Sequence, residues 1–175
     1  VIALDAKVSV DDDAMFRHTD LAELRDWSQE DDLEAKAGQA RISYVKLDGD
    51  VGCLVNGAGL GMATMDIVSA AGFHPANFLD VGGGADPDRV AQTIDILIGN
   101  PKVKRILVNV FGGIARCDDI ALGIVKAIPA SQKGMPIVVR FLGTNMEEGK
   151  RILQQSGLNT HFVDSLAEAT EVLRG

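Results

Sequence analysis

The chain has 175 residues, of which 46% are hydrophobic and 24% charged, and its formal net charge is -8. This acidic balance excludes general nucleic-acid binding, which needs a surplus of cationic side chains to neutralise phosphates. No apolar run reaches the roughly 18 to 20 residues that a membrane-spanning helix needs, whereas the length suffices for one ordinary domain with a peripheral segment.

The amino-terminal part, residues 1–41, differs in pattern from the remainder. Residues 1–8 predict a strand, ended by the acidic turn at residues 11–13, which lacks the spaced oxygen ligands of a calcium loop. Residues 19–27 and 33–40 predict two short helices. Because the chain begins at Val1 and not at Met, we expect it to be a piece of a longer protein, with residues 1–41 as the end of one domain and a connector.

From residue 42 to residue 175 the pattern is regular, with apolar runs that are each followed by a helical stretch. Five such runs are present, at residues 51–55, 77–81, 106–111, 137–142 and 160–163. Runs with few charges suit a parallel sheet that is covered on both faces. The pattern therefore predicts an α/β domain with a flavodoxin-like, doubly wound parallel sheet of about five strands and helices on both faces.

The helices carry recognisable start and stop patterns. Asp86-Pro87 predicts one helix start, and Ser165 with Glu168 predicts a capping box at another. Gly72 is placed to end the helix that follows the first strand. The residues expected to share the buried face of that helix are Leu60, Ala63, Ile67, Val68 and Ala71.

Three glycine-rich turns follow the first three strands, and they predict the working edge of the sheet. They lie at residues 56–59, 82–84 and 112–118. Glycine removes side-chain bulk where backbone N–H groups and a helix start can hold a carboxylate or a phosphoryl group. The alternative is that these glycines only permit tight turns, and the amide of Asn56 could equally satisfy turn backbone.

A dinucleotide-binding fingerprint is incomplete. Gly57, Gly59 and Asp80 have suitable spacing, but Met62 stands at the third position, where glycine or alanine is required. The sequence also lacks the glycine-rich phosphate loop that ends in Lys-Ser or Lys-Thr.

The cysteines and histidines give no catalytic or metal-binding pattern. Cys53 and Cys117 indicate reduced thiols, and a structural role is expected for Cys117 because no histidine lies near it in sequence. The three histidines lack metal-ligand spacing: His18, His74 and His161.

Four long motifs in one order carry a family resemblance. They are Asn56-Gly57-Ala58-Gly59-Leu60, Met65-Asp66-Ile67-Val68, the run from Ala76 to Gly84, and the run from Phe111 to Asp118. Together they resemble the β subunit of succinyl-CoA synthetases, also called succinate-CoA ligases, and the likeness extends to Asp5-Ala6-Lys7 and Ser28-Gln29-Glu30-Asp31.

The resemblance implies an enzyme that joins a carboxylate to coenzyme A (CoA) and consumes ATP or GTP, through a phosphohistidine and an acyl phosphate. In that family the histidine and the CoA site lie on an α subunit, and the β subunit binds nucleotide and Mg²⁺ in an amino-terminal ATP-grasp domain. The chain then corresponds to the carboxy-terminal CoA-ligase domain at 42–175, with the end of ATP-grasp at 1–41. We expect this fragment to be inactive alone.

The resemblance also assigns site residues. Asn56 matches the family's substrate-carboxylate position, and Gly113, Ile114 and Ala115 match its substrate-binding loop, with alanine where the family usually has valine. Asp5 matches a Mg²⁺ ligand whose usual asparagine partner would precede Val1. The helix after the loop resembles the one that faces the phosphohistidine of the α subunit.

Alternatives stay open at this point. The acid could be succinate or malate, since malate-CoA ligases share the architecture. The chain could also be a non-catalytic module that binds the α subunit, or an NAD-binding domain. The implied location is the cytoplasm for a bacterial protein and the mitochondrial matrix for a eukaryotic one.

Overall fold

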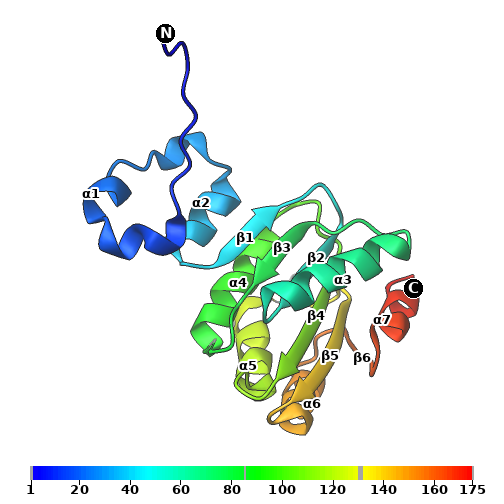
Figure 1. Cartoon of the computed structure of the whole chain (residues 1–175). Helices are drawn as coiled ribbons and strands as arrows, with labels where there is room; N and C mark the ends of the chain where they lie inside the picture. The colour runs from blue at the N-terminus through cyan, green and yellow to red at the C-terminus, as the bar shows by residue number, and fades with distance from the viewer. Residues whose placement is uncertain (1, 85, 130–131, 175) are drawn as a thin grey trace. The chain divides into compact units, whose positions relative to one another are not determined.

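A computed structural model describes residues 2–84, 86–129 and 132–174 (Figure 1). Its contacts divide the chain into two compact units, Val1–Asp31 and Asp32–Gly175. The second unit starts with a helix that packs on the sheet, ten residues before the domain boundary expected from the sequence. The assignment of residues 1–41 to the end of an ATP-grasp domain stays a prediction.

The first unit holds only short helical turns. These are η1 (Asp12–Arg17), α1 (Thr19–Ala22) and η2 (Trp27–Gln29), so the helix predicted over residues 19–27 ends early. The strand predicted over residues 1–8 is wrong for the described residues 2–8, which form no regular structure. Ile2, Leu4 and Val8 are exposed. A strand needs a neighbour to accept its backbone hydrogen bonds, and this unit contains none within its described part.

The second unit is built on a six-stranded sheet of order β1-β3-β2-β4-β5-β6. Its strands are β1 (Ser43–Lys46), β2 (Val51–Val55), β3 (Asn77–Asp80), β4 (Arg105–Gly112), β5 (Ile137–Gly143) and β6 (Thr160–Phe162). The five predicted strands are confirmed, and they run parallel in the flavodoxin-like order. The sixth, β1, was not predicted and pairs antiparallel with β3.

Helices cover both faces of the sheet (Figure 1). One face carries α2 (Asp32–Gln39), α4 (Pro87–Gly99), α5 (Cys117–Ala127) and α6 (Met146–Gln155) over the larger apolar core. The other carries α3 (Ala58–Ala70) and α7 (Leu166–Leu173) over a smaller core. No helix in the described ranges has both the length and the apolar character to cross a membrane.

The predicted cap at Asp86 is present, and the predicted capping box forms in part, because the Glu168 carboxylate accepts the N–H of Asp164 and not that of Ser165. The Asp86 carboxylate accepts the Arg89 N–H at 2.8 Å and the Ser165 hydroxyl accepts the Glu168 N–H at 3.1 Å, so each satisfies an otherwise unpaired donor at a helix start. Gly72 adopts a φ of 87° directly after α3 and ends it as expected.

The buried face of α3 differs from the prediction. Gly61, Thr64 and Val68 are buried, whereas Ala63 and Ile67 face outward. Hydrophobicity alone misplaced this face because the helix packs through its small residues. A Cβ at Gly61 would lie 2.9 Å from the Phe78 ring, and the Thr64 hydroxyl bonds the buried Asn109 amide at 2.8 Å.

Candidate functional site

The turns after β2, β3, β4 and β5 meet at the carboxyl edge of the parallel strands. The chain leaves β2 toward β3 on one side and returns to β4 on the other, so the topological switch point lies between β2 and β4. Ligands of open α/β sheets bind at such points, in the crevice outside the strand ends. Asn56 follows β2 directly and the loop at residues 113–115 follows β4, so the residues expected to bind the substrate flank the switch point.

Asn56 joins the two strands at this point. Its Nδ2 donates to the Phe111 carbonyl at 2.8 Å, and its Oδ1 accepts the Phe111 N–H at 2.9 Å. The side chain thereby imitates a peptide group and continues the pairing of β2 with β4 for one more step. One Nδ2 hydrogen and one Oδ1 lone pair stay outside these two bonds. Both sequence interpretations of Asn56 are therefore chemically compatible with the geometry.

Asp80, at the end of β3, ties two of the glycine turns together. Its Oδ1 accepts the Gly57 N–H at 2.6 Å and the Gly82 N–H at 2.7 Å. The spacing of Asp80 from Gly57 had matched part of the incomplete dinucleotide-binding fingerprint, in which such an acidic residue binds a ribose hydroxyl. The structure instead gives this carboxylate backbone donors from two turns, and it thereby orders the backbone around Asn56.

The loop after β4 is open on its outer side. Gly112 has a φ of 140°, a conformation that favours glycine, and a Cβ there would lie 3.6 Å from Asn56 Nδ2. Ile114 is 80% exposed and Ala115 only 3% exposed. Across the described ranges, the N–H groups of Ile114 and Ala115 donate to no other group. Gly112 thus lies beside Asn56, and the loop that follows it has two unpaired N–H groups, one on exposed Ile114 and one on buried Ala115.

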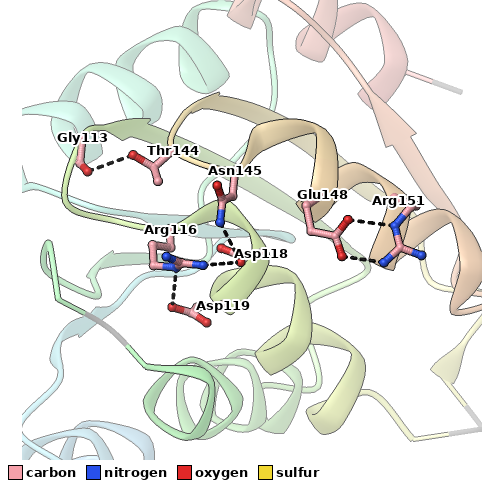
Figure 2. Close-up of polar contacts among 8 residues, drawn as sticks. All are labelled: Gly113, Arg116, Asp118, Asp119, Thr144, Asn145, Glu148 and Arg151. Atoms are coloured by element: carbon pink, nitrogen blue, oxygen red, sulfur yellow. Dashed lines mark hydrogen bonds and ion pairs between the residues drawn. The ribbon is translucent and has the colours of Figure 1, made fainter.

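The turn after β5 supports this loop (Figure 2). The Thr144 hydroxyl donates to the Gly113 carbonyl at 2.9 Å, and the Thr144 carbonyl accepts the Cys117 N–H at 3.0 Å. Cys117 begins α5, whose N-cap residue Arg116 makes no side-chain cap. The positive end of the α5 dipole therefore lies next to the loop, and the Asp118 and Asp119 carboxylates in the first turn of α5 partly offset it.

Charged side chains surround the start of α5. Arg116 lies 2.7 Å from Asp118 and 3.3 Å from Asp119, and the Asn145 amide donates to Asp118 at 3.0 Å (Figure 2). Burial acts to raise the pKa of Asp118, whose side chain is 13% exposed, but the hydrogen bonds from Arg116 and Asn145 outweigh it and the net pKa lies below its usual value. The Asp118 carboxylate therefore stays ionised and links α5 to the turn after β5.

The cysteines have no activated thiol. Burial raises the pKa of Cys53 to about 12, and burial with the nearby Asp118 charge raises that of Cys117 to about 11. These shifts agree with the structural role expected for Cys117. Within the part of the chain that the structure describes, no three His, Cys, Asp or Glu side chains gather as metal ligands.

Asp5 lies in the first unit, where it is exposed and its Oδ1 accepts the N–H of Ala6 at 2.8 Å. In the described ranges Asp5 belongs to no group of three or more His, Cys, Asp or Glu side chains that could hold a metal ion. A hard cation such as Mg²⁺ needs about six oxygen ligands, and one exposed carboxylate supplies too few. The residues present therefore do not form a magnesium site by themselves.

The profile of the CoA-ligase family matches residues 54–173, which include all four turns of the carboxyl edge. The chain belongs to the CoA-ligase family. Asn56, the loop at residues 113–115 and the supporting turn at Thr144 are thus all parts of the CoA-ligase domain.

Relatives in this family are similar over nearly the whole chain. The β subunit of an ADP-forming succinate-CoA ligase from Paramagnetospirillum magneticum is 55% identical over 171 residues, which make up 98% of this chain and 43% of the relative. A probable malate-CoA ligase β subunit from Mesorhizobium japonicum is 54% identical, with the same coverage of both chains. The chain thus spans less than half the length of the curated relatives it matches.

Solved structures share the fold of the CoA-ligase domain. An ATP citrate lyase from Methanosaeta concilii, a D541A mutant in complex with (3S)-citryl-CoA, superposes with a TM-score of 0.76. The match covers 95% of this chain and 50% of the lyase, at 17% identity. A likeness at this identity supports the mixed, mostly parallel α/β architecture.

Proposed function

We propose that the chain is the carboxy-terminal part of the β subunit of a nucleotide-dependent succinate-CoA ligase, and that its carboxyl edge binds the substrate carboxylate. The observation that carries this proposal is the pair of unpaired N–H groups at Ile114 and Ala115, beside Asn56 and the uncapped start of α5. Backbone donors at a helix start favour an anion. The high identity to succinate-CoA ligase β subunits supports the choice of reaction.

In the proposed reaction, Asn56 and the N–H groups of residues 113–115 hold the carboxylate beside a phosphohistidine of the α subunit. A carboxylate oxygen forms a bond to phosphorus, the bond from phosphorus to the imidazole nitrogen breaks, and an acyl phosphate results. The sulfur of CoA, bound on the α subunit, then forms a bond to the acyl carbon, the bond from that carbon to the phosphate oxygen breaks, and inorganic phosphate leaves. The contribution of this chain is positioning, together with the backbone N–H donors of the loop that leads into α5.

ATP or GTP and Mg²⁺ would be bound mainly by an amino-terminal ATP-grasp domain that lies outside this chain. Asp5 would contribute one oxygen to the ion, which would neutralise phosphate charge on the nucleotide. The isolated fragment is accordingly proposed to be inactive. For a bacterial source we propose the cytoplasm as its location, and for a eukaryotic source the mitochondrial matrix.

The test removes one loop N–H in the complete heteromeric enzyme. Ile114→Pro eliminates the donor, and Ile114→Ala is the matched control because the side chain is 80% exposed. We expect the proline variant to raise the succinate KM at least about tenfold, the equivalent of about 1.4 kcal/mol, and the alanine variant to leave it within about twofold. An unchanged KM in Ile114→Pro would reject the carboxylate site.

Two alternatives have specific support. The similarity to a probable malate-CoA ligase β subunit favours malate as a competing acid, which a comparison of kcat/KM for the two acids decides. The exposure of Phe111 (60%) and Ile114 (80%) at the carboxyl edge favours subunit binding as a separate role. If the isolated chain co-elutes with an α subunit and the mixture has no activity, that result would support the alternative of a non-catalytic module that binds the α subunit.

A further inference from the structure

Thr144 holds the candidate carboxylate loop at both of its ends. Its hydroxyl donates to the Gly113 carbonyl at 2.9 Å, where the loop begins (Figure 2). Its own carbonyl accepts the N–H of Cys117 at 3.0 Å, where the loop ends in α5. One residue of the turn after β5 therefore spans the whole segment that joins β4 to α5.

The hydroxyl bond also determines which way a loop donor points. In a trans peptide group the C=O and the following N–H lie in one plane and point in opposite directions. The bond from Thr144 to the Gly113 carbonyl therefore directs the N–H of Ile114 away from the turn after β5. That N–H has no partner within the described ranges, so it is left for a ligand.

The turn that carries Thr144 is itself constrained on either side. Gly143 has a φ of 129°, and a Cβ there would lie 2.0 Å from the Gly112 carbonyl oxygen. Asn145 has a φ of 58°, and its side-chain amide donates to Asp118 at 3.0 Å. A turn fixed at both neighbours gives the Thr144 hydroxyl a defined position, which a positioning role requires.

We propose that Thr144 is a positioning residue for the carboxylate substrate, because its hydroxyl holds the Gly113–Ile114 peptide group in the orientation that presents the Ile114 N–H. The inference rests on the proposed function of the loop. Thr144 does not touch the substrate; it acts through the peptide group. The apolar core does not require the hydroxyl, since Thr144 is half-exposed at the edge of the sheet.

The experiment compares Thr144→Val with Thr144→Ser in the complete heteromeric enzyme. Valine keeps the branched shape and loses the hydroxyl, and serine keeps the hydroxyl and loses a methyl group. We expect Thr144→Val to raise the KM of the carboxylate substrate about three- to tenfold, as loss of one hydrogen bond predicts, and Thr144→Ser to stay within about twofold. The KM values for nucleotide and CoA should not move in either variant.

Three results would overturn the inference. The first is an unchanged carboxylate KM in Thr144→Val, and the second is an equal rise there in the KM values for carboxylate, nucleotide and CoA. The third is a carboxylate KM in Thr144→Ser that rises as much as in Thr144→Val. The Ile114→Pro variant separates this inference from the proposed function. If Ile114→Pro raises the carboxylate KM and Thr144→Val does not, only the role of Thr144 is wrong. If neither variant changes it, the carboxylate site itself is wrong.

Discussion

Asn56 and Phe111 exchange two hydrogen bonds at the switch point, with Nδ2 to the Phe111 carbonyl at 2.8 Å and the Phe111 N–H to Oδ1 at 2.9 Å. These residues are 55 positions apart in the chain. The pair fixes the distance between the ends of β2 and β4, and hence between the two proposed halves of the carboxylate site.

We therefore expect Asn56→Ala to affect both stability and substrate binding in the complete enzyme. The two lost bonds should lower the free energy of unfolding by about 1–3 kcal/mol, and the succinate KM should rise or turnover fall. Urea unfolding and steady-state kinetics measure the two effects.

Asn77 provides the matched control for that prediction. It makes the same pair of bonds with Cys53, at 2.8 and 2.9 Å, inside the sheet. Asn77→Ala should lower stability similarly or more, and leave the succinate KM of the folded enzyme unchanged. Equal kinetic effects in both variants would assign Asn56 a purely structural role.

The Asp80 carboxylate should contribute to stability through Gly57 and Gly82. Asp80→Ala removes two charge-assisted acceptor contacts, and we expect a loss of about 2–4 kcal/mol by urea unfolding. Asp80→Asn keeps one acceptor oxygen and should lose clearly less. A ranking in which asparagine destabilises as much as alanine would contradict the role of the two N–H contacts.

Asp118 should make stability depend on acid pH. Its pKa in the folded protein lies below the ordinary 3.8, because the contacts with Arg116 and Asn145 outweigh burial. A depressed folded pKa contributes stability that is present above 3.8 and is lost as the pH falls through the folded value. Asp118→Asn should therefore reduce the loss of stability between pH 5 and pH 2, measured by thermal unfolding.

Glu148 serves as the control for this pH dependence. Its hydrogen bond with Arg151 also lowers its pKa, but the pair is exposed, so solvent screens it and Glu148→Gln should change the acid profile little. An equal effect of both substitutions on the loss of stability at acid pH would contradict the claim that Asp118 contributes more to it than the exposed Glu148.

Both cysteines should resist alkylation in the folded protein. The raised pKa values, about 12 for Cys53 and about 11 for Cys117, keep the thiols protonated at pH 8, and both side chains are buried. We expect no iodoacetamide adduct by intact mass at pH 8 and two adducts after denaturation in urea. Fast modification of Cys117 in the native state would contradict the buried environment.

Local patterns predicted most of the fold. The five parallel strands follow from continuous apolar runs, and the helix starts at Asp86 and Ser165 follow from side chains that bond a nearby N–H. The strand β1 was missed because it is short and largely exposed, so its pattern differs little from a loop. The strand predicted at residues 1–8 is wrong for the described residues 2–8, because apolar residues alone supply no partner strand.

The site was predictable only in part. Glycines and Asn56 indicated the edge because strand ends on a parallel sheet must meet there. The contacts of Asp80 with Gly57 and of Thr144 with Gly113 join residues 23 and 31 positions apart. Such pairs depend on register and loop geometry, which hydrophobic periodicity does not encode.

The near-contact between Gly143 and the Gly112 carbonyl limits how this domain can be redesigned. Any side chain at Gly143 would force the ends of β4 and β5 apart and misalign both loops together. Libraries that seek a different acid preference should therefore leave these two glycines invariant and diversify the outward-facing Ile114, where new volume meets no neighbouring strand.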